Sequence, residues 1–555
     1  MIKKRTATGF ALTLAVLVAP VAYPEDHLNN RNGIRRVLLI SIDGMHALDY
    51  ENCVNGGYCP NLADLGKHGV NYTRTSTSKP SDSFPGLMAL VTGGTPRSVG
   101  AFYDVAYDRI LAPPKVTTGN GLAGGDCHAG MPNGTTTEYE EGVEFDQSLV
   151  NGGGPYSTFD AGIKSINPDR LPRDPLNGCK PVYPWQFIRT NSIYGVIHAA
   201  GGYTAWEDKH AVYAVVSGHG DTADNVDDYY SPEVNSVVVA IPGLKTATGQ
   251  SCDPIRDKSQ LGDWTMSFLN IQCNDALKVN GVINQIHGMT HDGKTKAPVP
   301  TIFGMNFQAV SVGQKLIEGG TGGVKGGYID AAGTPTGPMM DEIKFVDASI
   351  GAMVNELKSD GLLDSTLVII TAKHGQSPVD THRFVEPSTS PADLVAAYLP
   401  FSESPLNPNG IGPTQDDISL LWLSHSSDTL TAVGILENPV NAANAAIGQI
   451  FYGPSLQTMY NVGDSRTPDI IVQPHVGVIY SHSSKKQAEH GGFAHDDTNV
   501  MMLLSNPNFA PRNVNTFVET TQVAPTILQA LGLDPNSLDA VQQEGTAVLP
   551  ALNFK

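Results

Sequence analysis

The chain has 555 residues, of which 40% are hydrophobic, so it can bury a large core. Its formal net charge is −20, with 35 basic against 55 acidic residues, which argues against the basic surface that binding to nucleic-acid duplexes requires. A small anionic ester can still bind where cations reverse the potential locally. The 58 glycines and 38 prolines predict long and numerous loops.

The N-terminus has the pattern of a signal peptide. Lys3, Lys4 and Arg5 precede an apolar run at 9–22 that is too short to span a bilayer, and a polar segment follows. We predict a signal peptide at residues 1–22 and a mature protein that is secreted or periplasmic. No later stretch of the sequence has the length of a membrane span.

Six cysteines fit an oxidising compartment, because an even count in an exported chain favours disulfides. Sequence alone leaves several pairings open. Proximity in the chain suggests three disulfides, Cys53–Cys59, Cys127–Cys179 and Cys252–Cys273. None of these pairs has the C-x-x-C spacing of a zinc or redox motif, so we predict a structural role for them.

Two nearly continuous β-prone runs, at 37–42 and 367–372, are typical of strands buried on both faces of a parallel sheet. Shorter runs occur at 469–472 and 500–504. Apolar residues at helical spacing lie between these strands at 341–358, and again near the end at 523–531. Alternating strands and helices predict an α/β fold, a mainly parallel sheet with helices on both faces.

Three stretches rich in Gly, Pro, Asn and Asp interrupt this alternation, at about 111–184, 221–295 and 381–465. We interpret residues 33–555 as a single domain that carries these stretches as insertions. Their expected use is a cap over the edge of the sheet that holds the active site.

Three polar residues directly follow the two longest predicted strands. Asp43 comes after the first, and Lys373 and His374 come after the second. Because ligands bind beyond the carboxyl ends of the strands in open α/β sheets, we expect these side chains to share one edge. Taken singly, Asp43 also fits an Asp-Gly turn, and His374 fits an ordinary loop histidine.

Ser83 precedes an apolar run at 87–91 that predicts a helix with Pro85 in its first turn. A serine in this position either caps the helix or directs its hydroxyl, with the first free amides, toward an anion. Ser78 and Ser81 lie close by, so spacing does not choose among the three serines. A serine hydroxyl is a weak nucleophile until a metal or a base lowers its pKa.

The order and spacing of five motifs resemble the nucleotide pyrophosphatase/phosphodiesterase branch of the alkaline-phosphatase superfamily: Ile40–Gly44, Ser83–Pro85, Val91–Gly93, Lys373–Gly375 and His490–Gly492. The resemblance runs from about residue 36 to about residue 533 and leaves out the three insertions. It implies an alkaline-phosphatase-like fold and hydrolysis of a phosphate mono- or diester through a phosphoserine on Ser83. The implied partner is a small-molecule phosphate ester.

In that family, two zinc ions lie at the strand ends. Carried over by position, the metal ligands here would be Asp43, Ser83, His374 and His490. Lys373 stands in place of an aspartate ligand, and Gln314 in place of a histidine ligand. The resemblance therefore implies a divalent metal, zinc, with one ion rather than two as an alternative.

Other residues can compensate for the lost metal ligands. We expect Lys373 to stabilise phosphoryl oxygens by its charge, and Asp104 to join the site as a replacement ligand. The alternative is that Asp104 only caps a turn and that Lys373 pairs with Asp43. Two other functions stay open: a binding or structural protein that has lost catalysis, and a sulfate-ester hydrolase, although the sulfatase x-Pro-x-Arg pattern does not follow Ser83. The sequence does not predict the oligomeric state.

Overall fold

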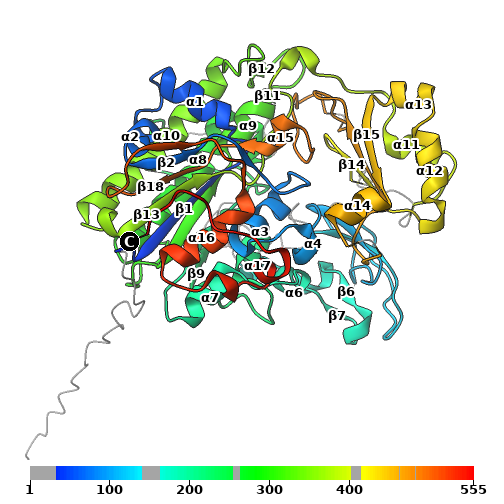
Figure 1. Cartoon of the computed structure of the whole chain (residues 1–555), viewed down its shortest axis with the longest axis horizontal. Helices are drawn as coiled ribbons and strands as arrows, with labels where there is room; N and C mark the ends of the chain where they lie inside the picture. Colours follow the sequence, from blue (N-terminus) through cyan, green and yellow to red (C-terminus); the bar gives the residue numbers. More distant parts are fainter. Residues whose placement is uncertain are drawn as a thin grey trace, which may run out of the picture.

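A computed structural model of the chain describes residues 33–119, 121–139, 163–253, 263–401, 414–461, 463–481 and 483–554. The predicted signal peptide, residues 1–22, lies outside these ranges. At the centre is an eight-stranded sheet with the strand order β19-β2-β18-β13-β1-β10-β8-β9 (Figure 1). Among these described strands only β18 runs against its neighbours. The predicted α/β fold with a mainly parallel sheet is confirmed.

In the same order, the strands of this sheet are Arg512–Val514, Gly69–Tyr72, Leu503–Ser505, Thr366–Thr371, Arg36–Ile42, Ile302–Phe307, Ala205–Glu207 and Asp228–Tyr230. The two longest predicted strands became β1 and β13, which pair in parallel at the middle of the sheet. The predicted run at 500–504 is divided between β17 (Asn499–Val500) and β18.

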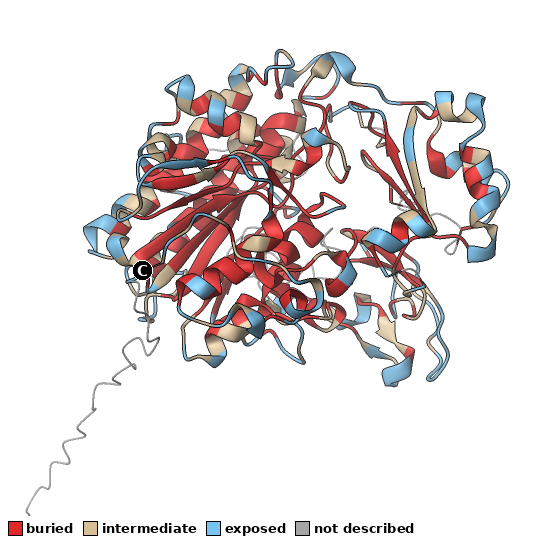
Figure 2. Ribbon diagram, viewed as in Figure 1, coloured by how far each residue is buried: buried red, intermediate tan, exposed pale blue. Residues whose placement is uncertain are grey.

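Strand β1 explains why two layers of helices form. Its successive side chains point to opposite faces, so Val37 and Leu39 enter one core while Leu38, Ile40 and Ile42 enter the other. The first core is covered by α3 (Ser83–Thr92), α7 (Ile193–Ala199) and α16 (Val523–Ala530). The second is covered by α1 (Ala47–Asn55), α2 (Pro60–Gly66), α8 (Phe268–Ile286), α9 (Ala309–Lys315) and α10 (Gly337–Ser359). Figure 2 shows the sheet buried between these layers.

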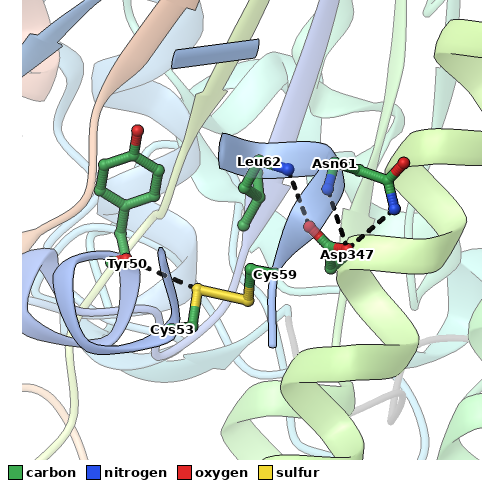
Figure 3. The surroundings of a disulfide bond; sticks show 6 residues. All are labelled: Tyr50, Cys53, Cys59, Asn61, Leu62 and Asp347. Atoms are coloured by element: carbon green, nitrogen blue, oxygen red, sulfur yellow. Dashed lines mark hydrogen bonds between the residues drawn. A yellow bond between two sulfur atoms is a disulfide. The ribbon is translucent and has the colours of Figure 1, made fainter. Parts of the chain in front are cut away.

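All three predicted disulfides are confirmed: Cys53–Cys59, Cys127–Cys179 and Cys252–Cys273. The first ties α1 to the start of α2 (Figure 3). Close to it, Asp347 of α10 accepts hydrogen bonds from the Asn61 side chain and the Leu62 backbone N–H, both at 2.8 Å. Helix α2 is therefore fixed to α1 by a covalent bond and to α10 by the amides of its first turn.

A smaller lobe lies to the right in Figure 1 and is built on a three-stranded antiparallel sheet in the order β14-β16-β15. The strands are Ser419–Leu421, Ile470–Pro474 and Ile447–Tyr452, and α11 (Pro391–Ala396) and α12 (Thr429–Leu436) share their core. The predicted run at 469–472 thus forms a strand, but in this lobe and not in the central sheet. The single domain 33–555 with insertions at 111–184, 221–295 and 381–465 stays a prediction.

The remaining elements are short. The paired strands are β3 (Thr75–Ser76) with β17 and β20 (Val518–Glu519), β4 (Val105–Asp108) with β5 (Thr135–Glu138), β6 (Arg173–Asp174) with β7 (Lys180–Pro181), and β11 (Ile317–Glu318) with β12 (Val324–Lys325). The short helices are α4 (Pro96–Val99), α6 (Pro184–Phe187), α13 (Pro439–Asn444), α14 (Pro454–Met459), α15 (His495–Thr498) and α17 (Asp539–Glu544). In the described part of the chain, no helix combines the length and apolarity needed to cross a membrane.

Candidate active site

Polar side chains from four strand ends meet at one edge of the central sheet. Asp43 follows β1, Lys209 follows β8 after one intervening residue, Asn306 lies near the end of β10, and Lys373 and His374 follow β13 after Ala372. The four strands run parallel, so their carboxyl ends face the same way. The expected sharing of one edge by Asp43, Lys373 and His374 is what the structure shows.

Ser83 reaches this edge from the first turn of α3. Asp82 caps the helix by accepting a hydrogen bond from the Phe84 N–H at 2.9 Å, so capping is not the role of Ser83. The helix lies so close to β13 that a side chain on Gly86 would meet the Lys373 carbonyl oxygen at 2.3 Å. A glycine is needed there because the close approach brings Ser83 beside the end of β13.

The structure distinguishes the three neighbouring serines by their contacts. The Ser78 hydroxyl donates to the backbone oxygen of Pro85, and the Ser81 hydroxyl donates to that of Asp497. Ser83 Oγ instead faces functional side chains, with the Lys209 ammonium at 3.1 Å, His374 Nε2 at 3.1 Å and Asp43 Oδ2 at 3.4 Å. Of the three, Ser83 is the one surrounded by groups that can activate it.

His374 has the tautomer of a base toward Ser83. Its Nδ1 lies 2.7 Å from the backbone oxygen of Gly375, and a carbonyl oxygen only accepts hydrogen bonds, so Nδ1 carries the proton. In the neutral ring Nε2 then has a lone pair, and this atom faces Ser83 Oγ. The Ser83 hydroxyl can therefore donate to His374 Nε2.

Asp43 Oδ2 is surrounded by hydrogen-bond donors and positive charge. The Asn306 side-chain amide donates to it at 3.1 Å, and the Gln308 amide donates to it as well. The Lys373 and Lys209 ammonium groups lie 3.5 and 3.7 Å away. Burial by itself raises the pKa of Asp43, but the ammonium groups of Lys373 and Lys209, together with the neighbouring His374, outweigh it and hold the pKa well below its usual value. Asp43 is thus ionised at neutral pH.

Lys373 is a fully buried ammonium directed into the site. Its Nζ lies 3.6 Å from Asp208 Oδ1 and 4.4 Å from the centre of the Tyr213 ring, whose face attracts a cation. Within the part of the chain that the structure describes, Lys373 Nζ has no hydrogen-bond partner. This side chain has electrostatic neighbours but leaves its N–H donors unused.

His490 closes the site on the side of the smaller lobe. Its ring centre lies 4.0 Å from that of His374, and its Nδ1 lies 3.6 Å from Asp82 Oδ1. Burial, followed by the neighbouring His374, Lys315 and Lys209, lowers the pKa of His490 well below its usual value, so the ring is neutral at pH 7. The Tyr103 hydroxyl lies 3.0 Å from the His490 backbone oxygen and 2.9 Å from Asp416, beside β14 of the smaller lobe.

The site reaches solvent at Lys209 and His490. Their side chains are 10% and 13% exposed, whereas those of Asp43, Lys373 and His374 are at most 1% exposed. Ser83 is completely buried. The two most exposed of these side chains are therefore a lysine and a neutral histidine, and the charged groups inside act in an environment of low polarity.

The donor set does not suit the metal ion that the family resemblance implies. Among the described residues, no three His, Cys, Asp or Glu side chains are grouped so that they could hold an ion. Two ammonium groups and two amides already surround Asp43 Oδ2. Two unit charges 4 Å apart repel by about 4 kcal/mol at an effective dielectric constant of 20, and a divalent ion doubles that. The ligand set Asp43, Ser83, His374 and His490 stays a prediction that these contacts disfavour.

Two other sequence-based assignments have partners of their own. Gln314, which stands in place of a histidine ligand, donates to the Gly44 carbonyl oxygen at 2.7 Å and to the Tyr328 hydroxyl at 2.8 Å. Asp104 accepts a hydrogen bond from the Val105 N–H at 2.7 Å, at the start of β4. Its participation in the site stays a prediction, whereas the alternative pairing of Lys373 with Asp43 is present in the structure.

The sequence allows Lys209 to reach the substrate from the sheet edge but favours an ordinary surface or loop role for it, and the structure places it beside Ser83. It follows β8, a strand of three residues, in the same way that Lys373 follows β13. The rule that placed Asp43 and Lys373 at the sheet edge applies equally to Lys209. Strand β8 is short, so its apolar signal is weak. The family resemblance also favours metal ligands, and a protonated lysine cannot be one. For these two reasons the sequence does not single out Lys209 as a neighbour of Ser83.

Comparisons with known proteins bear on the family and the fold. The family model described as type I phosphodiesterase/nucleotide pyrophosphatase matches residues 37–238 and 327–496, which is more than half of the chain. The unmatched stretch between them contains β10 and α9. The comparison with curated proteins found no significant match.

Solved structures show the same fold at low identity. Murine ectonucleotide pyrophosphatase/phosphodiesterase 5 has a TM-score of 0.50 and 14% identity, with 90% of this chain and 96% of that chain covered; its inactive variant in complex with AMP gives the same values. A substituted variant of the alkaline phosphatase PafA has a TM-score of 0.54 and 12% identity, with 90% and 96% covered. The chain therefore belongs to the type I phosphodiesterase/nucleotide pyrophosphatase family, and it is a phosphate-ester hydrolase with an alkaline-phosphatase-like fold.

Proposed function

We propose that the protein hydrolyses phosphate mono- or diesters through a phosphoserine on Ser83, with His374 as the base and Lys209 as the cation at the nucleophile. The observation that carries this proposal is the position of Ser83 Oγ, 3.1 Å from both His374 Nε2 and Lys209 Nζ. A nucleophile hydrogen-bonded to a base of defined tautomer is the arrangement required for covalent catalysis.

In the first half of the reaction, Ser83 Oγ attacks phosphorus in line with the leaving oxygen. The Oγ–P bond forms while the bond to the leaving oxygen breaks, and the Ser83 proton moves to His374 Nε2. The leaving oxygen takes a proton from water at the open side of the site. Lys209 donates a hydrogen bond to Oγ and stabilises the negative charge that develops there.

In the second half, water attacks phosphorus from the side that the leaving group has vacated. The P–Oγ bond breaks, Ser83 recovers its proton from His374, and the proton of the attacking water passes to solvent. Asp43 stays ionised and holds both lysines in place by charge. The residues return to their starting protonation states after each cycle.

The lysines beside Asp43 occupy the place where a metal ion of the family would bind. Members of this family use divalent metal ions such as zinc. A zinc ion on Asp43, Ser83, His374 and His490 would have to displace the ammonium groups that lie beside Asp43. In the proposed reaction the side chains of the chain itself supply the base and the positive charge.

We also propose that the protein acts outside the cytoplasm. The three disulfides fit an oxidising environment, and together with the predicted signal peptide they support a secreted or periplasmic enzyme. The substrate would then be a small phosphate ester outside the cytoplasm.

The test is hydrolysis of aryl phosphate mono- and diesters by the wild type and Ser83→Ala. We expect Ser83→Ala to lose about a thousandfold or more in kcat, and rapid quenching of the wild type to yield a phosphate adduct on the Ser83 peptide. Ser78→Ala is the matched control, because its hydroxyl contacts only the backbone in the structure described above. Activity that survives Ser83→Ala would show that another group is the nucleophile, and turnover of aryl sulfates alone would favour a sulfate-ester hydrolase.

A further inference from the structure

The buried charges around Asp43 suggest how this site binds an anion. We propose that Lys209 and Lys373 form a metal-independent anion-binding pair that supplies, at Ser83, the positive charge that a divalent ion would supply. The inference rests on the proposed function, because it concerns how that reaction is stabilised.

Both ammonium groups flank the same oxygen of Asp43, and one of them, that of Lys209, also contacts the nucleophile. Their Nζ atoms lie 3.7 and 3.5 Å from Asp43 Oδ2, and Lys209 Nζ also lies 3.1 Å from Ser83 Oγ. An ion that bridged Asp43 and Ser83 would compete with Lys209 for both oxygens. The position that would suit a metal is therefore already served by fixed cations.

Lys373 indicates that this pair has a ligand. A protonated lysine has three N–H donors, and a buried donor without an acceptor is unfavourable. The side chain of Lys373 is fully buried, and within the described residues its Nζ has no hydrogen-bond partner. The Tyr213 ring attracts the charge but offers no oxygen to the N–H groups. An oxygen of a bound phosphoryl group would complete the missing bonds.

The pair also fits the charge that develops during the reaction. Negative charge spreads over the phosphoryl oxygens and the attacking oxygen as the bonds change, and donors held in place beforehand stabilise it without reorganisation. Lys209 contacts the attacking oxygen directly, and Lys373 lies beside Asp43 with no hydrogen-bond partner for its Nζ among the described residues. The proposal uses both lysines only as hydrogen-bond donors, so the proton transfers remain those of Ser83 and His374.

Inorganic phosphate is the first probe, because its binding needs no turnover. The protein is treated with a chelator, its metal content is verified, and phosphate binding is measured by calorimetry. We expect the metal-free wild type to bind one phosphate per chain, and Lys373→Met to lower the affinity at least about tenfold through loss of a charge-assisted hydrogen bond. Lys358→Met removes an exposed charge near the end of α10 and should bind like the wild type.

Phosphate binding that requires added zinc, or that is the same in wild type and Lys373→Met, overturns the proposal. Thermal unfolding shows whether each variant is folded. Should Lys373→Met fail to fold, Lys209→Met takes its place, because the Lys209 side chain lies at the opening and its replacement disturbs the core less.

Hydrolysis of an aryl phosphodiester before and after chelation is the second measurement. We expect the rate to stay within about twofold, whereas an activity that disappears on chelation and returns with zinc would contradict the proposal. A protein that binds phosphate without metal but never hydrolyses the ester would overturn the proposed function and leave the lysine pair standing as an anion-binding site. The two proposals can thus fail separately.

Discussion

Two buried lysine–aspartate pairs lie on either side of Asn306 in β10, and they differ in one respect. Lys278 Nζ donates to the Asn306 backbone oxygen at 2.6 Å and lies 2.8 Å from Asp275 Oδ1. The Asn306 side chain donates to Asp43, and Lys373 Nζ lies 3.5 Å from Asp43 Oδ2. Both pairs are almost completely excluded from solvent.

The first pair is satisfied and the second is not. Asp275 also accepts hydrogen bonds from the backbone N–H groups of Gln308 and Ala309 at the start of α9. In the second pair, within the described residues, Lys373 Nζ and Asp43 Oδ1 have no hydrogen-bond partner. The same two residue types at the same depth thus form a structural link in one place and a site open to a ligand in the other.

The largest expected effect is on the structural pair. Lys278→Met should lower the free energy of unfolding by about 3–5 kcal/mol, because it leaves Asp275 as a buried charge without its counterion. Urea unfolding measures it, with Lys358→Met as the exposed control. A loss below about 1 kcal/mol would mean that the bonds of Lys278 contribute little and would weaken the contrast between the pairs.

The second effect is on the open pair. Lys373→Met should lower kcat/KM for an aryl phosphate ester by about 10²–10³-fold, the cost of removing one donor from a preorganised anion site. Its thermal stability should change less than that of Lys278→Met, since Lys209 remains as a counterion of Asp43 and Lys373 Nζ has no hydrogen-bond partner among the described residues. Equal damage to stability in the two variants would show that Lys373 is a structural residue as well.

A third buried pair consists of two aspartates, Asp417 and Asp497, and here a bound proton takes the place of the lysine. Asp417 and Asp497 lie together, both at most 2% exposed. Burial comes first among the causes that raise the pKa of Asp497 to about 7; the charge of Asp496 adds to it, while Asp417 and His46 oppose it. Burial and the neighbouring Asp497 raise the pKa of Asp417 well above its usual value.

The sign of the expected pH effect follows from that shift. The folded state binds protons that the unfolded chain has released above about pH 4, so this pair makes stability fall as the pH rises from about 4 to 7, by at most about 1.4 kcal/mol per pH unit for each carboxyl group. Asp497→Asn imitates the protonated form and should be more stable than the wild type at pH 8 but not at pH 4. Parallel stability curves for the two proteins would show that Asp497 does not titrate in this range.

The smallest expected effect concerns substrate charge. The ammonium groups of Lys209 and Lys373 are balanced by the carboxylates of Asp43 and Asp208, so these four groups sum to zero. Such a site favours a singly charged diester over a doubly charged monoester. Asp208→Asn adds one positive charge and should raise the ratio of monoester to diester kcat/KM by about tenfold. A ratio that falls would contradict this charge balance.

Much of the fold was predictable because long buried strands have a clear signature. The apolar runs at 37–42 and 367–372 gave β1 and β13, and the helical spacing at 341–358 gave α10. The run at 469–472 is as apolar as a central strand, yet it pairs with β14 and β15 nearby in the chain. Apolar pattern reports burial but not which sheet a strand joins.

The site was predictable only in part. Asp43, Ser83 and His374 follow from strand ends and from the start of a helix, and they do lie together. The use of Asn306 and Gln308 as donors to Asp43 depends on the register between β1 and β10, which a single sequence does not display. The sequence allows Lys209 to reach the substrate from the sheet edge, but the family resemblance favours metal ligands over an anion-binding lysine.

The convergence of four segments on one oxygen of Asp43 has a consequence for mutational routes. Changing Lys373 to an aspartate alone would leave Lys209, Asn306 and Gln308 aimed at the same place, and an incoming cation would still meet an ammonium beside Ser83. Conversion between a lysine-based and a metal-based centre therefore requires coordinated replacements at the ends of separate strands. Sequences with only some of these replacements would hold neither a lysine nor a metal ion well at this site. We therefore expect such intermediate sequences to have low activity.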